Sequence, residues 1–317
     1  MFLTDSLYIK TIMNYIPISS IAKFIGKCKY SSFEKEFINI LQSYHTKTFD
    51  DLKRCYLEEI DIYQPNVNLI LSKFPNLKFD HNLSATQNFE KLCQRKRVRK
   101  FLSSQDFFDS VTTTVKTEKD KEEVVKETIK EDIQEFITDQ IYDETVVEQV
   151  AENNNLPIDI VKSVAIKERG TVLETNTIDY LKSNTKYDSY IEQKKVYGRF
   201  ANFVTSGKID LVGLMDGDIR CVYEIKNRKS EYLHINPPEY DYIQLYCYIY
   251  LVGKKGKIVS QYDGDVIIHQ TISKKVAAYE FENNIKPLLD DCIKWANKII
   301  ENKYSKETFE LLSEFLN

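Results

Sequence analysis

Residues 207–226 read GKIDLVGLMDGDIRCVYEIK, and this stretch decides the fold that we expect. Lys208–Leu214 alternates between apolar and polar side chains, as a half-buried strand does. Asp216 and Gly217 then supply a tight turn, and Ile219–Lys226 returns as a second strand. The sequence therefore predicts an antiparallel β-hairpin centred on this Asp-Gly pair.

The hairpin carries the residues with the clearest chemical meaning. Glu224 and Lys226 stand two positions apart on one strand, so they project to the same face, and the antiparallel neighbour can place Asp210 beside them. Two carboxylates and an ammonium on a buried face are costly unless a cation or a tight network compensates them. A divalent cation held by Asp210, Glu224 and the backbone carbonyl of Ile225 would do so, and oxygen ligands favour Mg²⁺ or Mn²⁺. Lys226 would then orient or help deprotonate an attacking water, which suits hydrolysis of a phosphodiester.

The elements around the hairpin predict an α/β fold in which a mixed central sheet is flanked by helices. The order is helix, three strands, helix, strand, helix (αβββαβ), and all the apolar stripes can be buried in this arrangement. The expected elements besides the hairpin are a helix over 170–181, a strand over 196–205, a helix over 240–251, strands over 257–261 and 265–271, and one long helix over 273–303.

The first third of the chain has a different character. Residues 1–110 read as a mainly helical N-terminal region that could bind DNA or a partner, and residues 111–150 as a charged helix or linker. We therefore expect the catalytic domain to span residues 151–317.

Four motifs follow one another in the second half: Arg169-Gly-Thr-Val-Leu-Glu174, Asp210, Glu224-Ile-Lys226 and Gln244-Leu-Tyr-Cys-Tyr248. Together they resemble the PD-(D/E)XK nuclease superfamily, in its phage lambda exonuclease-like and RecB-like branches. The version carried by large DNA viruses is the most similar, and the resemblance covers about residues 165–300. The chain departs from many phage members, because the extended arginine-plus-glycine segment before the first glutamate is missing. This argues against a specific 5′-phosphate pocket and a ring-shaped trimer.

The resemblance implies a Mg²⁺- or Mn²⁺-dependent deoxyribonuclease. It implies a site made of Glu174, Asp210, Glu224, Lys226 and Gln244, with Glu174 as a further metal ligand. Two alternatives stay open at single positions, since Glu174 could be a solvated glutamate near a helix N-terminus and Gln244 a polar helix residue satisfied by the backbone. Tyr248, one helical turn after Gln244, could pack or contact a phosphate.

Basic residues are candidates for contacts with the DNA backbone. Those near the site are Arg169, Arg199, Arg228 and Lys229. The most concentrated run is Arg95, Lys96, Arg97, Arg99 and Lys100. This run could grip phosphates, form the solvated face of a helix, or act as a nuclear import signal.

The function that these expectations favour is an exonuclease acting at duplex DNA ends, in recombination, repair or viral genome processing. One alternative is a structure-specific endonuclease. Another is a catalytically inactive nuclease fold used as a DNA-binding module. The N-terminal region could bind a partner such as a single-strand annealing protein.

Composition sets the remaining limits. The 317 residues are 42% hydrophobic with a formal net charge of −4, which excludes a disordered chain and argues against coating DNA by bulk charge, although not against a local basic groove. No apolar run is long enough for a bilayer, and the first residues make a poor signal peptide. Six dispersed cysteines and four isolated histidines predict neither a zinc site nor a disulfide framework. We expect an intracellular, reducing compartment: for a viral protein, the host cytoplasm or nucleus.

Overall fold

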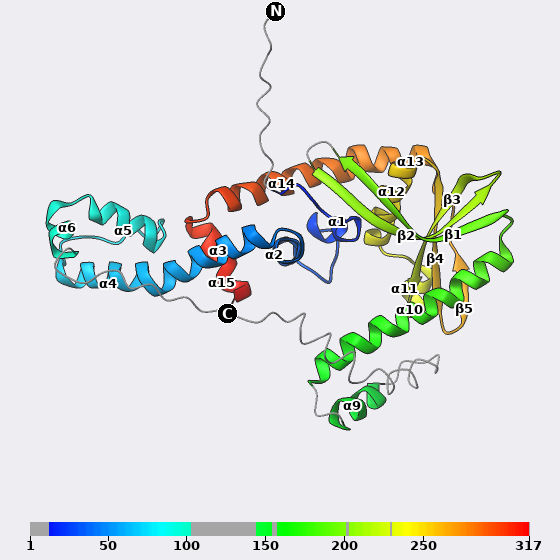
Figure 1. Ribbon diagram of the computed structural model, residues 1–317, viewed down its shortest axis with the longest axis horizontal. Helices are drawn as coiled ribbons and strands as arrows, with labels where there is room; N and C mark the ends of the chain where they lie inside the picture. The colour runs from blue at the N-terminus through cyan, green and yellow to red at the C-terminus, as the bar shows by residue number, and fades with distance from the viewer. Residues whose placement is uncertain (1–12, 103–143, 154–156, 201–202, 229, 317) are drawn as a thin grey trace, which may run out of the picture. The chain divides into compact units, whose positions relative to one another are not determined.

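The computed structural model describes residues 13–102, 144–153, 157–200, 203–228 and 230–316 (Figure 1). By its internal contacts the chain divides into two units, and each is described by itself. Unit 1 contains Met1–Val111, Tyr197–Ser206 and Glu282–Asn317, and unit 2 contains Thr112–Val196 and Gly207–Phe281. The C-terminal residues thus group with the N-terminal region, whereas the sequence analysis placed 151–317 in one domain. Most of the expected linker at 111–150 lies outside the described residues.

Unit 1 is mainly helical, as predicted for the N-terminal region. Its helices are α1 (Ile18–Phe24), α2 (Phe33–Tyr44), α3 (Thr46–Glu58), the π-helix η1 (Glu59–Tyr63), α4 (Gln64–Lys73), α5 (Ala85–Cys93), α6 (Lys96–Leu102), α14 (Lys286–Glu301) and α15 (Lys306–Leu316). Helix α2 begins at a polar cap, because the Ser32 hydroxyl accepts the N–H of Lys35 at 3.1 Å.

The C-terminal helices complete the core of unit 1. The ring of Trp295 on α14 meets those of Phe33 and Phe37 on α2, with centroids 4.6 and 5.2 Å apart. Helix α15 contacts both α2 and α3, and Leu312 is fully buried there. These contacts bury apolar faces that neither end of the chain could bury alone.

Helices α4, α5 and α6 form a distinct part of unit 1, here called the α4–α6 lobe (residues 64–102). The lobe has a hydrophobic cluster of its own, made of Val67, Ile70, Leu77, Ala85, Leu92 and Val98. Helix α5 starts with a capping box between Ser84 and Gln87. The buried carboxylate of Glu59 also accepts the N–H of Thr86 at 2.8 Å, so the free donors at this helix start are satisfied.

Unit 2 is built on a five-stranded mixed sheet, as predicted. The strands are β1 (Ser189–Phe200), β2 (Phe203–Met215), β3 (Asp218–Asn227), β4 (Lys255–Tyr262) and β5 (Asp265–Ile268). They lie in the order β1-β2-β3-β4-β5. Strands β2 and β3 are antiparallel, β3 and β4 are parallel, and β4 and β5 are antiparallel. The predicted hairpin joins β2 to β3 through Asp216 and Gly217, whose φ angles of 55° and 77° suit a type I′ turn.

Helices cover both faces of β3. Those of unit 2 are α9 (Glu144–Asn153), α10 (Ile158–Asn184), α11 (Glu231–Ile235), α12 (Glu239–Val252) and α13 (Lys274–Glu280). On one face, Ile178 and Leu181 of α10 join Tyr223 and Ile225 of β3 in a hydrophobic cluster. Helix α12 contacts β3 and β4 through the other face, where Lys226 meets Gln244. Alternation along β3 therefore assigns Tyr223 and Ile225 to the core and Glu224 and Lys226 to the α12 side.

The prediction of one long helix over residues 273–303 was wrong. The structure has α13, then the π-helix η2 (Phe281–Ile285), then α14. Pro287 lies in the first turn of α14. Because proline has no N–H and its ring clashes with the preceding turn, a regular helix cannot run through this position.

No helix within the described ranges is long and apolar enough to cross a membrane. All six cysteines are free thiols.

Candidate active site

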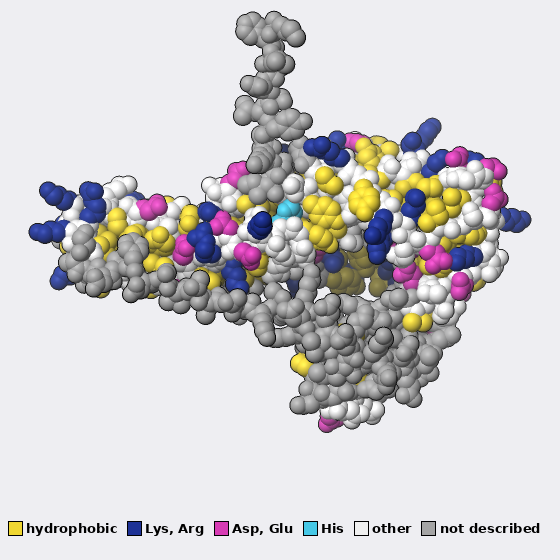
Figure 2. All heavy atoms as spheres, viewed as in Figure 1, with side chains coloured by type: hydrophobic (Ala, Val, Ile, Leu, Met, Phe, Trp, Pro, Cys, Tyr) yellow, Lys and Arg dark blue, Asp and Glu magenta, His cyan; other side chains and the backbone are white. Residues whose placement is uncertain are grey.

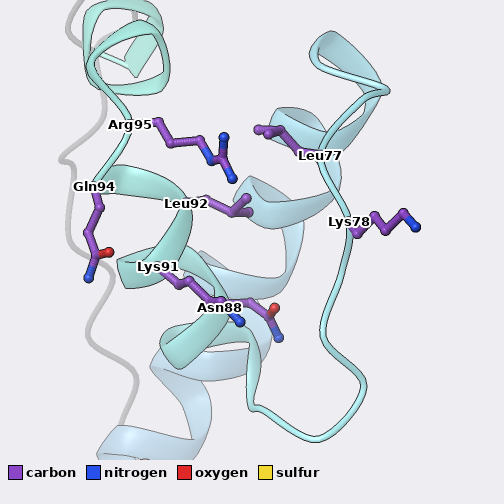
Figure 3. Close-up of a pocket in the computed structure, with 7 residues that line it drawn as sticks. All are labelled: Leu77, Lys78, Asn88, Lys91, Leu92, Gln94 and Arg95. Atoms are coloured by element: carbon purple, nitrogen blue, oxygen red, sulfur yellow. The ribbon is translucent and has the colours of Figure 1, made fainter.

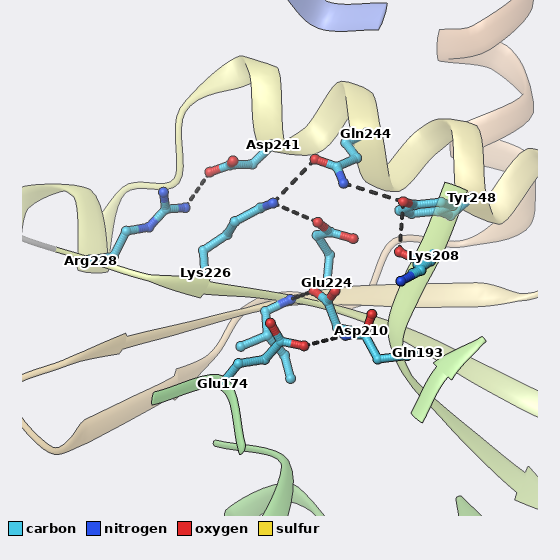
Figure 4. A network of polar contacts seen from close by, with 11 residues as sticks. Glu174, Gln193, Lys208, Asp210, Glu224, Lys226, Arg228, Asp241, Gln244 and Tyr248 are labelled. Atoms are coloured by element: carbon cyan, nitrogen blue, oxygen red, sulfur yellow. Dashed lines mark hydrogen bonds and ion pairs between the residues drawn. The ribbon is translucent and has the colours of Figure 1, made fainter. Parts of the chain in front are cut away.

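The site forms where β2 and β3 separate (Figure 4). Their paired register runs from Met215–Asp218 at the turn to Leu211–Tyr223. Beyond it, the N–H of Ile225 donates to the Asp210 carboxylate at 2.7 Å instead of to a neighbouring strand. The N–H and C=O of one strand residue point to the same side, so the Ile225 carbonyl also faces the side from which β2 has diverged.

Two carboxylates lie at this opening, and one of them is incompletely satisfied. Glu224 is only 1% exposed. Its Oε1 accepts a hydrogen bond from Lys226 at 2.6 Å, whereas its Oε2 is buried without a hydrogen-bond partner. Burial, together with the charge of Glu224, raises the pKa of Asp210 to about 8, against the opposing effects of Lys226 and the Ile225 N–H. Burial likewise raises the pKa of Glu224, although Lys226 opposes the shift.

Lys226 is held between a strand and a helix. Its Nζ donates to Glu224 and, at 3.2 Å, to the Gln244 side-chain oxygen. Burial alone would lower the pKa of Lys226, but Glu224, Asp241 and Asp210 outweigh it and raise the pKa above its usual range. The side chain is therefore an ammonium that can donate hydrogen bonds but cannot accept a proton in this state.

Gln244 is oriented by Tyr248, one turn further along α12. The Gln244 amide nitrogen lies 3.4 Å from the Tyr248 hydroxyl, which donates to the Lys208 carbonyl at 2.8 Å. Tyr248 is 2% exposed, so the packing alternative holds and a contact with a phosphate is not supported. Gly207 permits this packing, because a Cβ at that position would lie 2.7 Å from the tyrosine ring.

Glu174 on α10 is close enough to affect the other carboxylates. Burial and the charge of Asp210 raise its pKa, while a hydrogen bond from Gln193 opposes the shift. Gln193 has a φ of 49°, an uncommon conformation for a residue other than glycine, in the middle of β1. A distorted strand thus directs the amide at Glu174.

The oxygen atoms at the opening are few, but they are of the kind that binds divalent cations. Within the residues that the structure describes, no three histidine, cysteine, aspartate or glutamate side chains form a group that could hold a metal ion. The carboxylates of Asp210 and Glu224, the latter with its unpartnered Oε2, and the Ile225 carbonyl lie at the opening. These oxygen donors fit Mg²⁺ or Mn²⁺, which retain several waters when a protein supplies few ligands. The role of Glu174 as a third carboxylate ligand stays a prediction.

Arg228 occupies a different place from the one expected. It was predicted to contact DNA, but its side chain is 7% exposed and forms an ion pair with Asp241, which is 3% exposed. The guanidinium is buried in this ion pair, so it is not accessible to a DNA backbone. The pair links the end of β3 to the first turn of α12, three residues before Gln244.

The other predicted DNA contacts are scattered. Arg169 is half-buried on α10, and Lys229 lies outside the described residues. Arg199 is exposed in the part of β1 that belongs to unit 1. Unit 1 also carries the run Arg95, Lys96, Arg97, Arg99 and Lys100, all of them exposed.

Sequence reasoning missed two residues that shape the site, Gln193 and Asp241. Asp241 could have been predicted to lie near the site, since it is three residues before Gln244 and so on the same side of a predicted helix. Gln193 had none, because its side chain reaches Glu174 only through a local distortion of β1.

Comparisons with known proteins add little. No protein-family model matches the chain, and no curated protein does. Solved structures that match include one described as the crystal structure of SSO0001, with 18% sequence identity and a TM-score of 0.33. That match covers 55% of this chain and 86% of the other. Similarity at this level carries no information about the function of this chain.

The raised pKa of Asp210 predicts an unusual pH dependence of stability in metal-free protein. Between its ordinary value near 4 and about 8, the folded chain holds a proton that the unfolded chain has lost. The free energy of unfolding should therefore fall as pH rises through this window, by up to about 1.4 kcal/mol per pH unit for one proton. Asp210→Asn should flatten this slope and increase stability at pH 8, as measured by urea unfolding in EDTA. An unchanged slope in the variant would contradict the assignment.

The buried ion pair predicts a large loss of stability on removal of one partner. Asp241→Asn should cost about 3–5 kcal/mol, because the Arg228 guanidinium would be left buried without its counter-charge. Asp265→Asn is a matched control, since this carboxylate is 78% exposed beside His234. It should change the free energy of unfolding by no more than about 0.5 kcal/mol. Equal effects of the two substitutions in urea unfolding would show that the Arg228–Asp241 pair contributes nothing special.

Proposed function

We propose that this protein is a metal-dependent deoxyribonuclease that hydrolyses phosphodiester bonds. The observation that carries the proposal is the convergence of Asp210, Glu224 and Lys226 at the opening between β2 and β3. Isolated pairs of strand-end Glu and Lys are common on protein surfaces. Here the glutamate is buried with an unpartnered oxygen, and the lysine is also bound by Gln244.

The residues divide the chemistry among themselves. Asp210, Glu224 and the Ile225 carbonyl would hold Mg²⁺, which supplies Lewis acidity and a more acidic bound water. Lys226, as an ammonium, is suited to donate a hydrogen bond to a phosphate oxygen or to orient the attacking water. Gln244 fixes the Lys226 Nζ, and Tyr248 fixes Gln244. In the net reaction, water adds to phosphorus, one P–O ester bond breaks, and the leaving oxygen takes up a proton.

The preference for duplex ends rests on the resemblance of the Arg169–Glu174, Asp210, Glu224–Lys226 and Gln244–Tyr248 motifs to lambda exonuclease-like enzymes. From the same resemblance follow the proposed roles in recombination, repair or viral genome processing, and a single-strand annealing protein as a partner. A structure-specific endonuclease would use the same site.

Digestion of end-labelled linear duplex DNA, with and without Mg²⁺, tests the proposal. Wild-type protein should degrade the duplex only with Mg²⁺, and Glu224→Gln and Lys226→Met should each lower the rate at least about 100-fold, because each removes a charge placed for the reaction. Glu231→Gln and Lys275→Met remove exposed groups of the same types outside the site and serve as controls.

The outcomes separate the alternatives. Full activity in both site variants would contradict the catalytic assignment. Cleavage of covalently closed circles would favour an endonuclease. Binding of DNA by the wild-type chain without any turnover would favour an inactive binding module.

A further inference from the structure

The α4–α6 lobe is strongly basic within an acidic chain. Residues 64–102 contain eight lysine and arginine residues against two acidic ones, Asp80 and Glu90, which gives a net charge of +6. The whole chain carries −4. Figure 2 shows lysine and arginine side chains gathered at the end of the lobe where α6 lies. Positive charge is therefore concentrated on this lobe, and the rest of the chain is correspondingly acidic.

The hydrophobic core of the lobe forces these charges outward. Val98 is fully buried in α6, whereas its neighbours along the helix are exposed. Leu92 and Leu77 close the same core from α5 and from the segment after α4. The exposed cations are therefore presented by a packed scaffold rather than by a flexible tail. Six of them form the surface: Lys78, Arg95, Lys96, Arg97, Arg99 and Lys100.

A pocket lies within this surface, between α5 and the segment after α4 (Figure 3). Arg95 projects toward Leu77, whereas Lys78 lines the opposite wall and its side chain points outward (Figure 3). The side chains of Asn88 and Gln94 add polar groups to the lining. The charge of Lys91 is partly neutralised, in contrast to those of Arg95 and Lys78, because its Nζ lies 3.0 Å from the Asp80 carboxylate. The positive charge that faces the pocket thus comes mainly from Arg95, and Lys78 adds a cation at its outer edge.

The aromatic side chains of the lobe are already used for packing. Phe74 packs edge-on against Phe101, and Phe89 packs against Tyr63. Within residues 64–102, all of which the structure describes, no tyrosine, phenylalanine or tryptophan side chain is exposed. Proteins that bind single strands stack bases mainly on exposed Tyr, Phe and Trp rings, and the lobe exposes none of these three. Its chemistry matches phosphate groups rather than bases.

We propose that the α4–α6 lobe is a sequence-independent binding surface for the phosphate backbone of duplex DNA. The choice of DNA as the polyanion rests on the proposed nuclease function, while the affinity for a phosphate backbone rests on the lobe itself. Its role is to hold the duplex through charge, independently of the groups that carry the reaction.

The test is the salt dependence of duplex binding by the full chain, measured in EDTA so that nothing is cleaved. The substitutions Arg95→Gln, Lys96→Gln and Lys100→Gln are combined in one variant. The matched control combines Lys29→Gln, Lys35→Gln and Lys47→Gln, which remove three exposed lysines from the rest of unit 1. Each phosphate contact contributes about 0.9 to the slope of log affinity against log salt. The slope of log affinity against log salt should be smaller in magnitude by up to about 3 in the lobe variant than in wild type. The lobe variant should also bind at least about tenfold more weakly at low salt. The control variant should match wild type in both measurements.

Equal slopes and affinities for the lobe variant and wild type would overturn the proposal. That result is also expected if the basic run acts only as a nuclear import signal. Tighter binding of single strands than of duplex by wild type, lost in the lobe variant, would likewise overturn it as stated. Thermal unfolding of both variants at the wild-type temperature verifies that the fold is intact. A loss of binding confined to the lobe variant supports the proposal even if the wild-type chain never cleaves DNA, so failure of the nuclease proposal is seen separately.

Discussion

A buried glutamate carboxylate with one unpaired oxygen is the constraint on which the rest of unit 2 depends. Glu224 is 1% exposed, and Lys226 satisfies only one of its two oxygens. Asp210 adds a second carboxylate close by, and its pKa rises to about 8 as a result of burial and this neighbour. Such an arrangement opposes folding, since burial either keeps Asp210 protonated or places two desolvated charges side by side. The proposed bound cation would supply the positive charge that this arrangement lacks.

One strand serves both the core and the site. The pleat of β3 directs Tyr223 and Ile225 into the hydrophobic cluster with α10, and Glu224 and Lys226 toward α12. A shift of the register by one residue would exchange these two sets, so the packing of the core also fixes the position of the charged groups. The type I′ turn at Asp216 and Gly217 and the register shift between Gly213 and Leu214 together set that register. Stability and proposed chemistry are thus specified by the same local pattern.

Much of this could be predicted from the sequence, because the signals were local. The Asp-Gly pair predicted the hairpin, and the spacing of Glu224 and Lys226 predicted a shared face. The structure brings Asp210, Lys226 and Gln244 together as expected. The site residues and the domain boundary that the sequence did not predict depend on contacts with other parts of the chain or on backbone distortion. Nothing in the residues next to Arg228 indicates that its side chain forms a buried ion pair with Asp241. Nothing near residue 282 indicates that α14 and α15 pack with the N-terminal helices.

Direct binding of a divalent cation tests the central claim, that Asp210 and Glu224 form a cation site. Isothermal titration of Mn²⁺ into metal-free protein at pH 8 should show one site per chain. Its affinity should fall at least about tenfold in Asp210→Asn and in Glu224→Gln, because each substitution removes one of two anionic ligands. Absence of binding to the wild-type chain, or equal binding by wild type and both variants, would contradict the claim.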